Sequence, residues 1–180
     1  DNFDFPFSTI SSREIFGGAK YIPYNLGSVY GFVKFLRESN VVRPDISSED
    51  IVIADFVPND IPPCAAIITS TFQAPLCHIS ILCKNRKTPN MYARDIFSSE
   101  FRHKLLTSEQ LSHISDSNLL SGAFIHLSVE ATKFDIHNLA NVDHQTQRQL
   151  IDHQLSVMQK DRPHIIVPKI SMRSTIGTCP

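Results

Sequence analysis

The sequence predicts a mixed α/β (α+β) fold, in which β-strands alternate with helices. Short apolar runs of strand length occur at 51–56 and 64–69, and a segment with helical spacing follows from residue 76. Alternating apolar residues return at 122–132. Strands that alternate with helical segments are typical of a domain in which helices cover a sheet. We expect this domain to span residues 21–135.

The composition is that of an ordinary globular protein. The 180 residues are 42% hydrophobic and 19% charged, and the formal net charge is −1. A balance so close to neutral offers no basic field for nucleic acid and no polybasic arm for a membrane surface. No apolar run approaches the roughly 20 residues that a membrane-spanning helix needs. Four cysteines in apolar surroundings are too few for a disulfide framework. They favour a reducing compartment, such as the cytoplasm or an organelle interior, without distinguishing between the two.

Residues 1–20 are predicted to be an entry segment. They are polar with scattered aromatic residues and end in a Gly-Gly turn signal. They lack the basic stretch and apolar run of a signal peptide. The chain does not begin with Met, which indicates a processed or trimmed protein.

The first strand is predicted at 28–36, "SVYGFVKFL", which is rich in residues that favour strands. Gly31 lies inside it and is expected to mark a bend or a bulge. The apolar runs at 51–56 and 64–69 fit buried strands, and a turn rich in Pro and Asp separates them.

A helix is predicted from residue 76 to about residue 87. Ile79, Leu82 and Cys83 have the i, i+3, i+4 spacing of one apolar stripe. Pro75 suits the first turn, where its missing N–H is not needed. Cationic side chains near the end complement a helix C-terminus, and Pro89 prevents continuation.

The rest of the chain gives weaker patterns. Residues 136–180 are expected to form an appendage, made of an amphipathic helix and a linker. That helix is predicted at 142–160, where Ile151, Leu155 and Met158 share a face. The other predicted elements are a return strand at 90–97, two short helical segments within 98–114, a strand at 122–132 and a β-like stretch at 164–170.

His78 stands at the predicted start of the helix. A helix N-terminus carries unpaired N–H groups and a partial positive charge, so it favours an anion beside it. A neutral imidazole there is a competent nucleophile, and a phosphoryl group on it would place its oxygens near those N–H groups. The local pattern alone also fits a structural histidine in the cap region.

A longer stretch carries a family resemblance. "IVIADFVPNDIPPCAAIITSTFQAPLCHISILCKNRKTPNM" resembles the swivelling phosphohistidine domain of the phosphoenolpyruvate-utilising enzymes and dikinases. "YNLGSVYGFVKFL" is similar to the opening of that domain. The version in glucan water dikinase-like proteins and the branch of phosphoenolpyruvate- and pyruvate-binding proteins look closest. The matching residues are Ala66, Ile67, Ile68 and Thr69 in the strand, and His78, Ile81, Cys83, Lys84 and Pro89 in and after the helix.

The resemblance implies a swivelling β/β/α fold with His78 as the phosphoryl carrier. It further implies a phosphate- or substrate-binding set made of Lys84, Arg86, Cys77 and Thr69. In the family, the domain moves between an ATP-grasp nucleotide site and a second site. The donor would be ATP or phosphoenolpyruvate, with ATP and magnesium held by an ATP-grasp-like partner module, while the acceptor stays open.

The sequence departs from the family pattern in places. The loop "FQAPLCH" lacks the usual glycines, and Cys77 replaces the commoner serine. Lys84 stands for the usual arginine, which keeps a cation but loses the bidentate fork that suits phosphate. The chain shows no Gly-rich phosphate loop followed by Lys. Residues 167–177 resemble the lead-in to an ATP-grasp module, so we expect a piece of a larger enzyme, or a subunit separated from its catalytic partner.

A second function of a different class fits the same residues. The chain can be a non-catalytic structural or interaction subunit that retains the fold and joins a larger assembly through the helix at 142–160. The histidines show no metal-binding motif. A zinc cluster of Cys77, His78 and Cys83 is disfavoured because the two thiols would point to different faces of one helix. We expect no metal and no cofactor in this chain.

Overall fold

The computed structural model describes residues 18–39, 45–74, 76–98, 101 and 122–160. These residues form one seven-stranded sheet and two helices, which confirms the mixed α/β class. The elements follow in the order β1 (Tyr21–Asn25), β2 (Gly27–Leu36), β3 (Asp50–Ala54), β4 (Ala66–Thr69), α2 (His78–Arg86), β5 (Asn90–Ala93), β6 (Phe124–Val129), β7 (Phe134–Asn138) and α5 (His144–Lys160).

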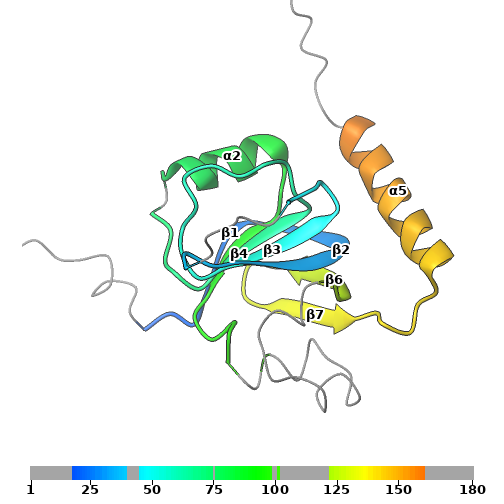
Figure 1. The fold of residues 1–180 in the computed structure, drawn as a ribbon. Helices are drawn as coiled ribbons and strands as arrows, with labels where there is room; N and C mark the ends of the chain where they lie inside the picture. Colours follow the sequence, from blue (N-terminus) through cyan, green and yellow to red (C-terminus); the bar gives the residue numbers. More distant parts are fainter. Residues whose placement is uncertain (1–17, 40–44, 75, 99–100, 102–121, 161–180) are drawn as a thin grey trace, which may run out of the picture.

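The sheet has the strand order β1-β5-β4-β3-β2-β6-β7. The four central strands are parallel, whereas β1, β6 and β7 pair antiparallel at the two sides. Figure 1 shows that the sheet is curled. The Tyr21 hydroxyl on β1 donates a hydrogen bond to the Glu130 carbonyl at 2.6 Å, and its ring lies 5.2 Å from that of Phe134 on β7. The curl therefore brings β1 against the β6–β7 hairpin, at the opposite end of the strand order.

Two apolar clusters occupy the two faces of the sheet. Because side chains alternate along a strand, Ile51 and Ile53 of β3 belong to one cluster and Val52 to the other. The larger cluster joins residues of β2 to β6 and lies inside the curl, where Tyr21 and Phe134 pack against it. The smaller cluster lies under α2 (Figure 1). It includes Ile79 of α2, and burial of this side chain fixes the helix on the sheet.

Most of the predicted elements are confirmed with shifted ends. The runs at 28–36, 51–56, 64–69 and 122–132 form β2, β3, β4 and β6, and the return strand at 90–97 is shorter, as β5. The strands β1 and β7 were not anticipated. β1 contains Pro23, which is tolerated because β1 is the last strand at its side of the sheet.

Gly31 was expected to mark a bend or a bulge, and the bulge is wrong. The pairing of β2 with β6 runs without interruption from Gly27 to Phe32. Glycine is needed for close approach instead: a Cβ atom at residue 31 would lie 2.5 Å from the Glu49 carbonyl oxygen and 2.9 Å from the Ile51 side chain. The chain entering β3 occupies that space.

The helix expected at 142–160 is α5. Asp143 caps its start, because the Thr146 N–H donates to the Asp143 carboxylate at 3.0 Å. Ile151 on its apolar stripe is fully buried.

The domain boundary expected at residue 135 falls within β7, which pairs with β6 along its length. α5 itself returns to β2, so it packs on the domain that the boundary would separate from it.

Gln154 of α5 completes the edge of β2. β2 extends beyond the start of β3, which leaves the backbone of Tyr30 without a strand partner on that side. The Tyr30 N–H donates to the Gln154 side-chain oxygen at 2.7 Å, and the Gln154 amide donates to the Tyr30 carbonyl at 3.1 Å. One side chain therefore supplies both hydrogen bonds of a missing neighbour strand.

Replacing Gln154 by leucine is expected to lower the free energy of unfolding by about 1–3 kcal/mol, because a backbone donor and acceptor lose their partner. Urea denaturation of the two proteins measures this loss. Gln149→Leu, an exposed site on the same helix, is the matched control and should change stability by less than about 0.5 kcal/mol. Equal stabilities of the two variants would contradict the assigned role.

Neither helix in the part of the chain described is long and apolar enough to cross a membrane. Several expectations lie outside the described residues: Pro75 in the first helical turn, nearly all of the helical segments within 98–114, and the β-like stretch at 164–170.

Candidate functional site at the start of helix α2

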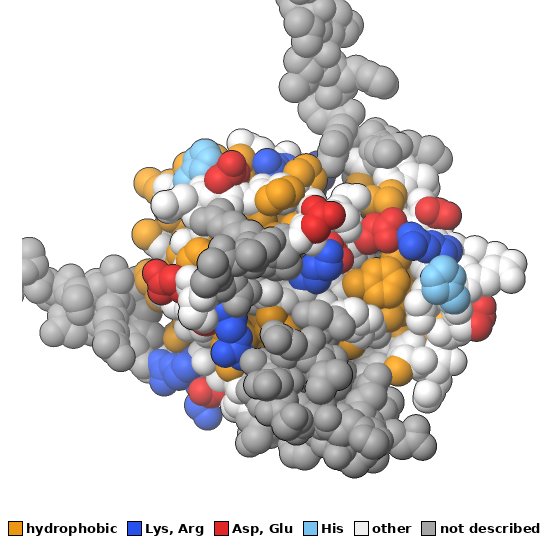
Figure 2. Space-filling model, in the orientation of Figure 1, with side chains coloured by type: hydrophobic (Ala, Val, Ile, Leu, Met, Phe, Trp, Pro, Cys, Tyr) orange, Lys and Arg blue, Asp and Glu red, His pale blue; other side chains and the backbone are white. Residues whose placement is uncertain are grey.

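His78 is the first residue of α2. The chain leaves β4 at Thr69, crosses a short loop and enters the nine-residue helix with Cys77 as the N-cap residue. The Cys77 side chain makes no capping hydrogen bond, and no acidic residue lies in the first turn. His78 is exposed, and Figure 2 shows hydrophobic, charged and histidine side chains together on the surface over α2. An exposed imidazole therefore lies beside backbone N–H groups that no side chain caps.

A buried polar network under α2 holds the loop that precedes His78. Gln73 is fully buried, and its amide nitrogen donates to Thr69 Oγ1 and to Asn90 Oδ1, both at 2.9 Å. Its side-chain oxygen accepts from Asn90 Nδ2 at 2.8 Å and from Ser80 Oγ at 3.0 Å. The Tyr24 hydroxyl donates to the Gln73 carbonyl and accepts from the Gln73 N–H, both at 2.9 Å. Backbone and side chain of this residue are thus fixed together.

Side-chain contacts are made at both ends of the helix. Ser80 Oγ in the first turn lies 3.2 Å from the Cys77 sulfur. At the other end, Asn25 Nδ2 donates to the carbonyl of Thr88 at 2.7 Å and to that of Cys83 at 3.4 Å. Burial raises the pKa of Tyr24 to about 12, so its hydroxyl keeps its proton and remains a donor. The helix is therefore anchored at its start and at its end.

The structure brings only one of the expected phosphate-binding residues next to His78. That residue is Cys77, which is partly exposed. Thr69 is fully buried, and its hydroxyl donates to the Thr71 carbonyl at 2.8 Å while accepting from Gln73. Its hydroxyl thus belongs to the network rather than to the surface around His78.

The two expected cations lie at the far end of α2. Lys84 and Arg86 belong to its last turn, and a rise of 1.5 Å per residue places them about 9 and 12 Å along the axis from His78. Arg86 donates to the Ile61 carbonyl at 2.8 Å. Both cations complement the partial negative charge of the helix C-terminus. The helix therefore does not bring either cation next to a phosphoryl group on His78.

The two buried cysteines are core residues. Cys64 is 7% exposed and Cys83 is 2% exposed, and both pack in the smaller apolar cluster. Burial, the largest cause, raises the pKa of each thiol to about 12. Such thiols are protonated at neutral pH and therefore unreactive. Burial of Cys83 also removes it from any zinc cluster with Cys77 and His78, and the residues described contain no group of three or more metal-ligating side chains.

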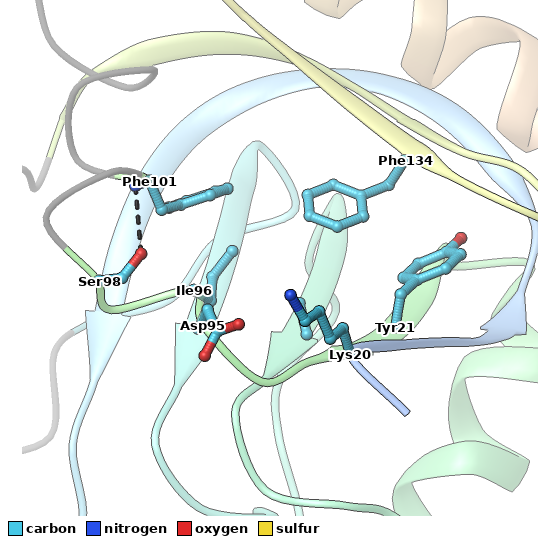
Figure 3. A pocket seen from close by; sticks show the side chains of 8 residues that line it. Lys20, Tyr21, Asp95, Ile96, Ser98, Phe101 and Phe134 are labelled. Atoms are coloured by element: carbon cyan, nitrogen blue, oxygen red, sulfur yellow. Dashed lines mark hydrogen bonds between the residues drawn. The ribbon is translucent and has the colours of Figure 1, made fainter. Parts of the chain in front are cut away.

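A cavity of about 250 Å³ lies elsewhere, between β1, β7 and the turn after β5 (Figure 3). Its lining is mixed: Phe101 and Phe134, whose rings lie 6.3 Å apart between centroids, are apolar, and Lys20, Asp95 and Ser98 are polar. His78 does not line it. The cavity is therefore separate from the start of α2.

Sequence reasoning missed the residues that hold the site. Gln73, Tyr24 and Asn90 are far apart in the sequence and carry no motif. The available signal was a glutamine in the short loop between a buried strand and a helix, where a side chain with two donors and an acceptor can bridge elements. It also missed the hydrogen bond between Ser28 and His126, which are 98 residues apart.

The comparisons with known proteins leave the chain without an assigned family. No protein-family model matches the sequence. No curated protein matches it significantly.

Proposed function

We propose that the chain is the phosphohistidine carrier of a dikinase-like phosphotransferase with the swivelling β/β/α fold, and that His78 carries the phosphoryl group. The observation that supports this function is the exposed imidazole at the first position of α2, next to first-turn N–H groups that no side chain caps. The family resemblance of the strand–loop–helix segment supports the same residue.

The chemistry needs little from the carrier besides position. A neutral nitrogen of His78 attacks the phosphorus, an N–P bond forms, and the P–O bond to the donor breaks with its electron pair on the leaving oxygen. The phosphoryl oxygens then face the N-terminal N–H groups, which favour negative charge. In the second step, an acceptor oxygen takes the phosphoryl group and His78 returns to the neutral imidazole.

The donor site belongs to a partner in this proposal. ATP and magnesium, or phosphoenolpyruvate, bind in an ATP-grasp-like module, and His78 is presented to it. Two large apolar side chains near His78 in sequence suit contact with such a partner, because Leu76 is 84% exposed and Ile81 is 44% exposed. The rigid network around Gln73 keeps the imidazole at the helix start while the domain moves between sites.

One observation favours the second function, a structural or interaction subunit that retains the fold. The cations expected to assist the phosphoryl group, Lys84 and Arg86, lie in the last turn of α2. A carrier with its cations so placed would depend on its partner to neutralise the charge of the phosphoryl group. A structural subunit would need no such neutralisation. The two functions differ in whether His78 holds phosphate.

Chemical phosphorylation tests the site without any partner. Phosphoramidate transfers phosphate to accessible imidazoles, and mass spectrometry at neutral to basic pH maps the products. We expect phosphate on His78 to hydrolyse about two- to five-fold more slowly than phosphate on His153, an exposed histidine inside α5, because a helix start stabilises an exposed anion by about 0.3–1 kcal/mol. Equal hydrolysis rates would remove the electrostatic argument for His78.

A further inference from the structure

A second group of reactive side chains lies on the antiparallel part of the sheet. The register of β2, β6 and β7 places Tyr30 opposite His126, and His126 opposite His137. Cross-strand partners project from the same face, and so do residues two apart on one strand. Ser28 therefore shares this face, and its Oγ lies 2.7 Å from Nε2 of His126. The fold has brought a hydroxyl and an imidazole into hydrogen-bonding contact.

The imidazole of His126 is held between two rings. The Tyr30 ring lies 4.6 Å away between centroids, and the His137 ring lies 6.1 Å away and is stacked with an interplanar angle of 15°. Burial, with a smaller contribution from His137, lowers the pKa of His126. A neutral ring with its proton on Nδ1 accepts the Ser28 proton at Nε2. The two rings hold the imidazole in place, and the lowered pKa favours the neutral form that a general base needs.

Ser28 is accessible. Its side chain lies on the exposed surface, whereas its neighbour Val29 points into the core. A positioned base within hydrogen-bond reach is the arrangement that turns a serine hydroxyl into a nucleophile. Ser28 and His137 on this face are exposed, which suits a small activated ester or an acyl group presented by another molecule.

We propose that Ser28 is a nucleophilic serine, activated by His126, which accepts an acyl or phosphonyl group from an activated ester. Ser28 Oγ attacks the carbonyl carbon or the phosphorus, and the bond to the leaving group breaks with its electron pair. The Ser28 proton passes to Nε2 of His126, which then gives it to the leaving group or to water. Atoms and charge balance without an oxidant or a metal.

The chain contains a matched control. Ser128 is the direct cross-strand partner of Ser28, so it shares the same face and lies two residues from His126 on the same strand. It differs from Ser28 in two respects: His126 Nε2 is bonded to Ser28, and Ser128 is half-buried whereas Ser28 is exposed. Proximity to the histidine is therefore shared, and the hydrogen bond is not.

The test is labelling with a fluorophosphonate probe, followed by mapping of the labelled serine by mass spectrometry. We expect the label on Ser28, none at this site in Ser28→Ala, and unchanged labelling in Ser128→Ala. His126→Phe keeps a ring against Tyr30 and His137 but has no base, so labelling of Ser28 should slow by about 100-fold. His126→Gln serves the same purpose if the phenylalanine variant fails to fold, as judged by its urea unfolding midpoint.

Equal labelling of Ser28 and Ser128 would overturn the proposal, and so would an unchanged rate at Ser28 in either folded His126 variant. His78→Ala should be labelled like the wild type, because this site shares no residue with the start of α2. Failure of one proposal therefore leaves the other standing.

Discussion

Replacing Gln73 by leucine is expected to lower the free energy of unfolding by about 3–5 kcal/mol. Leucine is close in size to glutamine but makes none of the four side-chain hydrogen bonds with Thr69, Ser80 and Asn90. The largest loss falls on Asn90, which is fully buried. Both its side-chain oxygen and its side-chain nitrogen would lose their hydrogen bonds to Gln73. Each buried polar group left without a partner costs about 1–3 kcal/mol.

Urea denaturation measures this effect, with Gln149→Leu as the control at an exposed position. The double variant Gln73→Leu, Asn90→Leu separates lost bonds from poor packing, because removing both partners costs less than leaving one unpaired. We expect it to be more stable than Gln73→Leu alone. A loss below about 1 kcal/mol in the single variant would show that the network does not hold the loop before His78.

Gly31→Ala is expected to destabilise the protein by about 3 kcal/mol, because the added Cβ atom overpacks the contact between β2 and the chain that enters β3. The new Cβ would lie 2.5 Å from the Glu49 carbonyl oxygen, which is backbone and cannot rotate away. That carbonyl also accepts the Phe32 N–H at 3.0 Å, so a shift of Glu49 weakens the first link between β2 and β3. Steric crowding and a lost hydrogen bond therefore act together.

Thermal unfolding compares Gly31→Ala with Gly18→Ala, since an added Cβ at residue 18 would meet nothing within 4 Å. The control should leave stability unchanged or slightly raise it, because alanine restricts the unfolded chain. If both variants unfold at the same temperature, the approach of Glu49 to β2 is looser than the structure shows.

Much of the parallel sheet and both described helices could be predicted from the sequence. β3 and β4 are buried on both faces, so their runs "DIVIA" and "AIIT" are almost uniformly apolar. α2 was predicted from the spacing of Ile79, Leu82 and Cys83; Ile79 and Cys83 are its two buried residues, whereas Leu82 is half-buried. In these segments, local sequence pattern and tertiary burial agree.

The rest depended on contacts between residues far apart in the chain. β1 contains a proline and is only half-buried, and none of the five residues of β7 is fully buried, so neither shows a strand pattern. The position of His78 could be predicted because it depends on one helix start. The network around Gln73 could not, since Tyr24 lies 49 residues and Asn90 17 residues away. The family resemblance implied that Lys84 and Arg86 assist His78, while the helical rise carries both of them away from it.

The most direct test of the central claim is the transfer of phosphate from a donor to His78. The protein is incubated with its native lysate and with β- or γ-labelled ATP or labelled phosphoenolpyruvate, and wild type is compared with His78→Ala and His153→Ala. The proposed function predicts a label that is stable in base, lost in acid, retained in His153→Ala and absent from His78→Ala. No label from any donor, in a wild-type protein that phosphoramidate still phosphorylates at His78, would contradict the carrier function and favour a structural subunit.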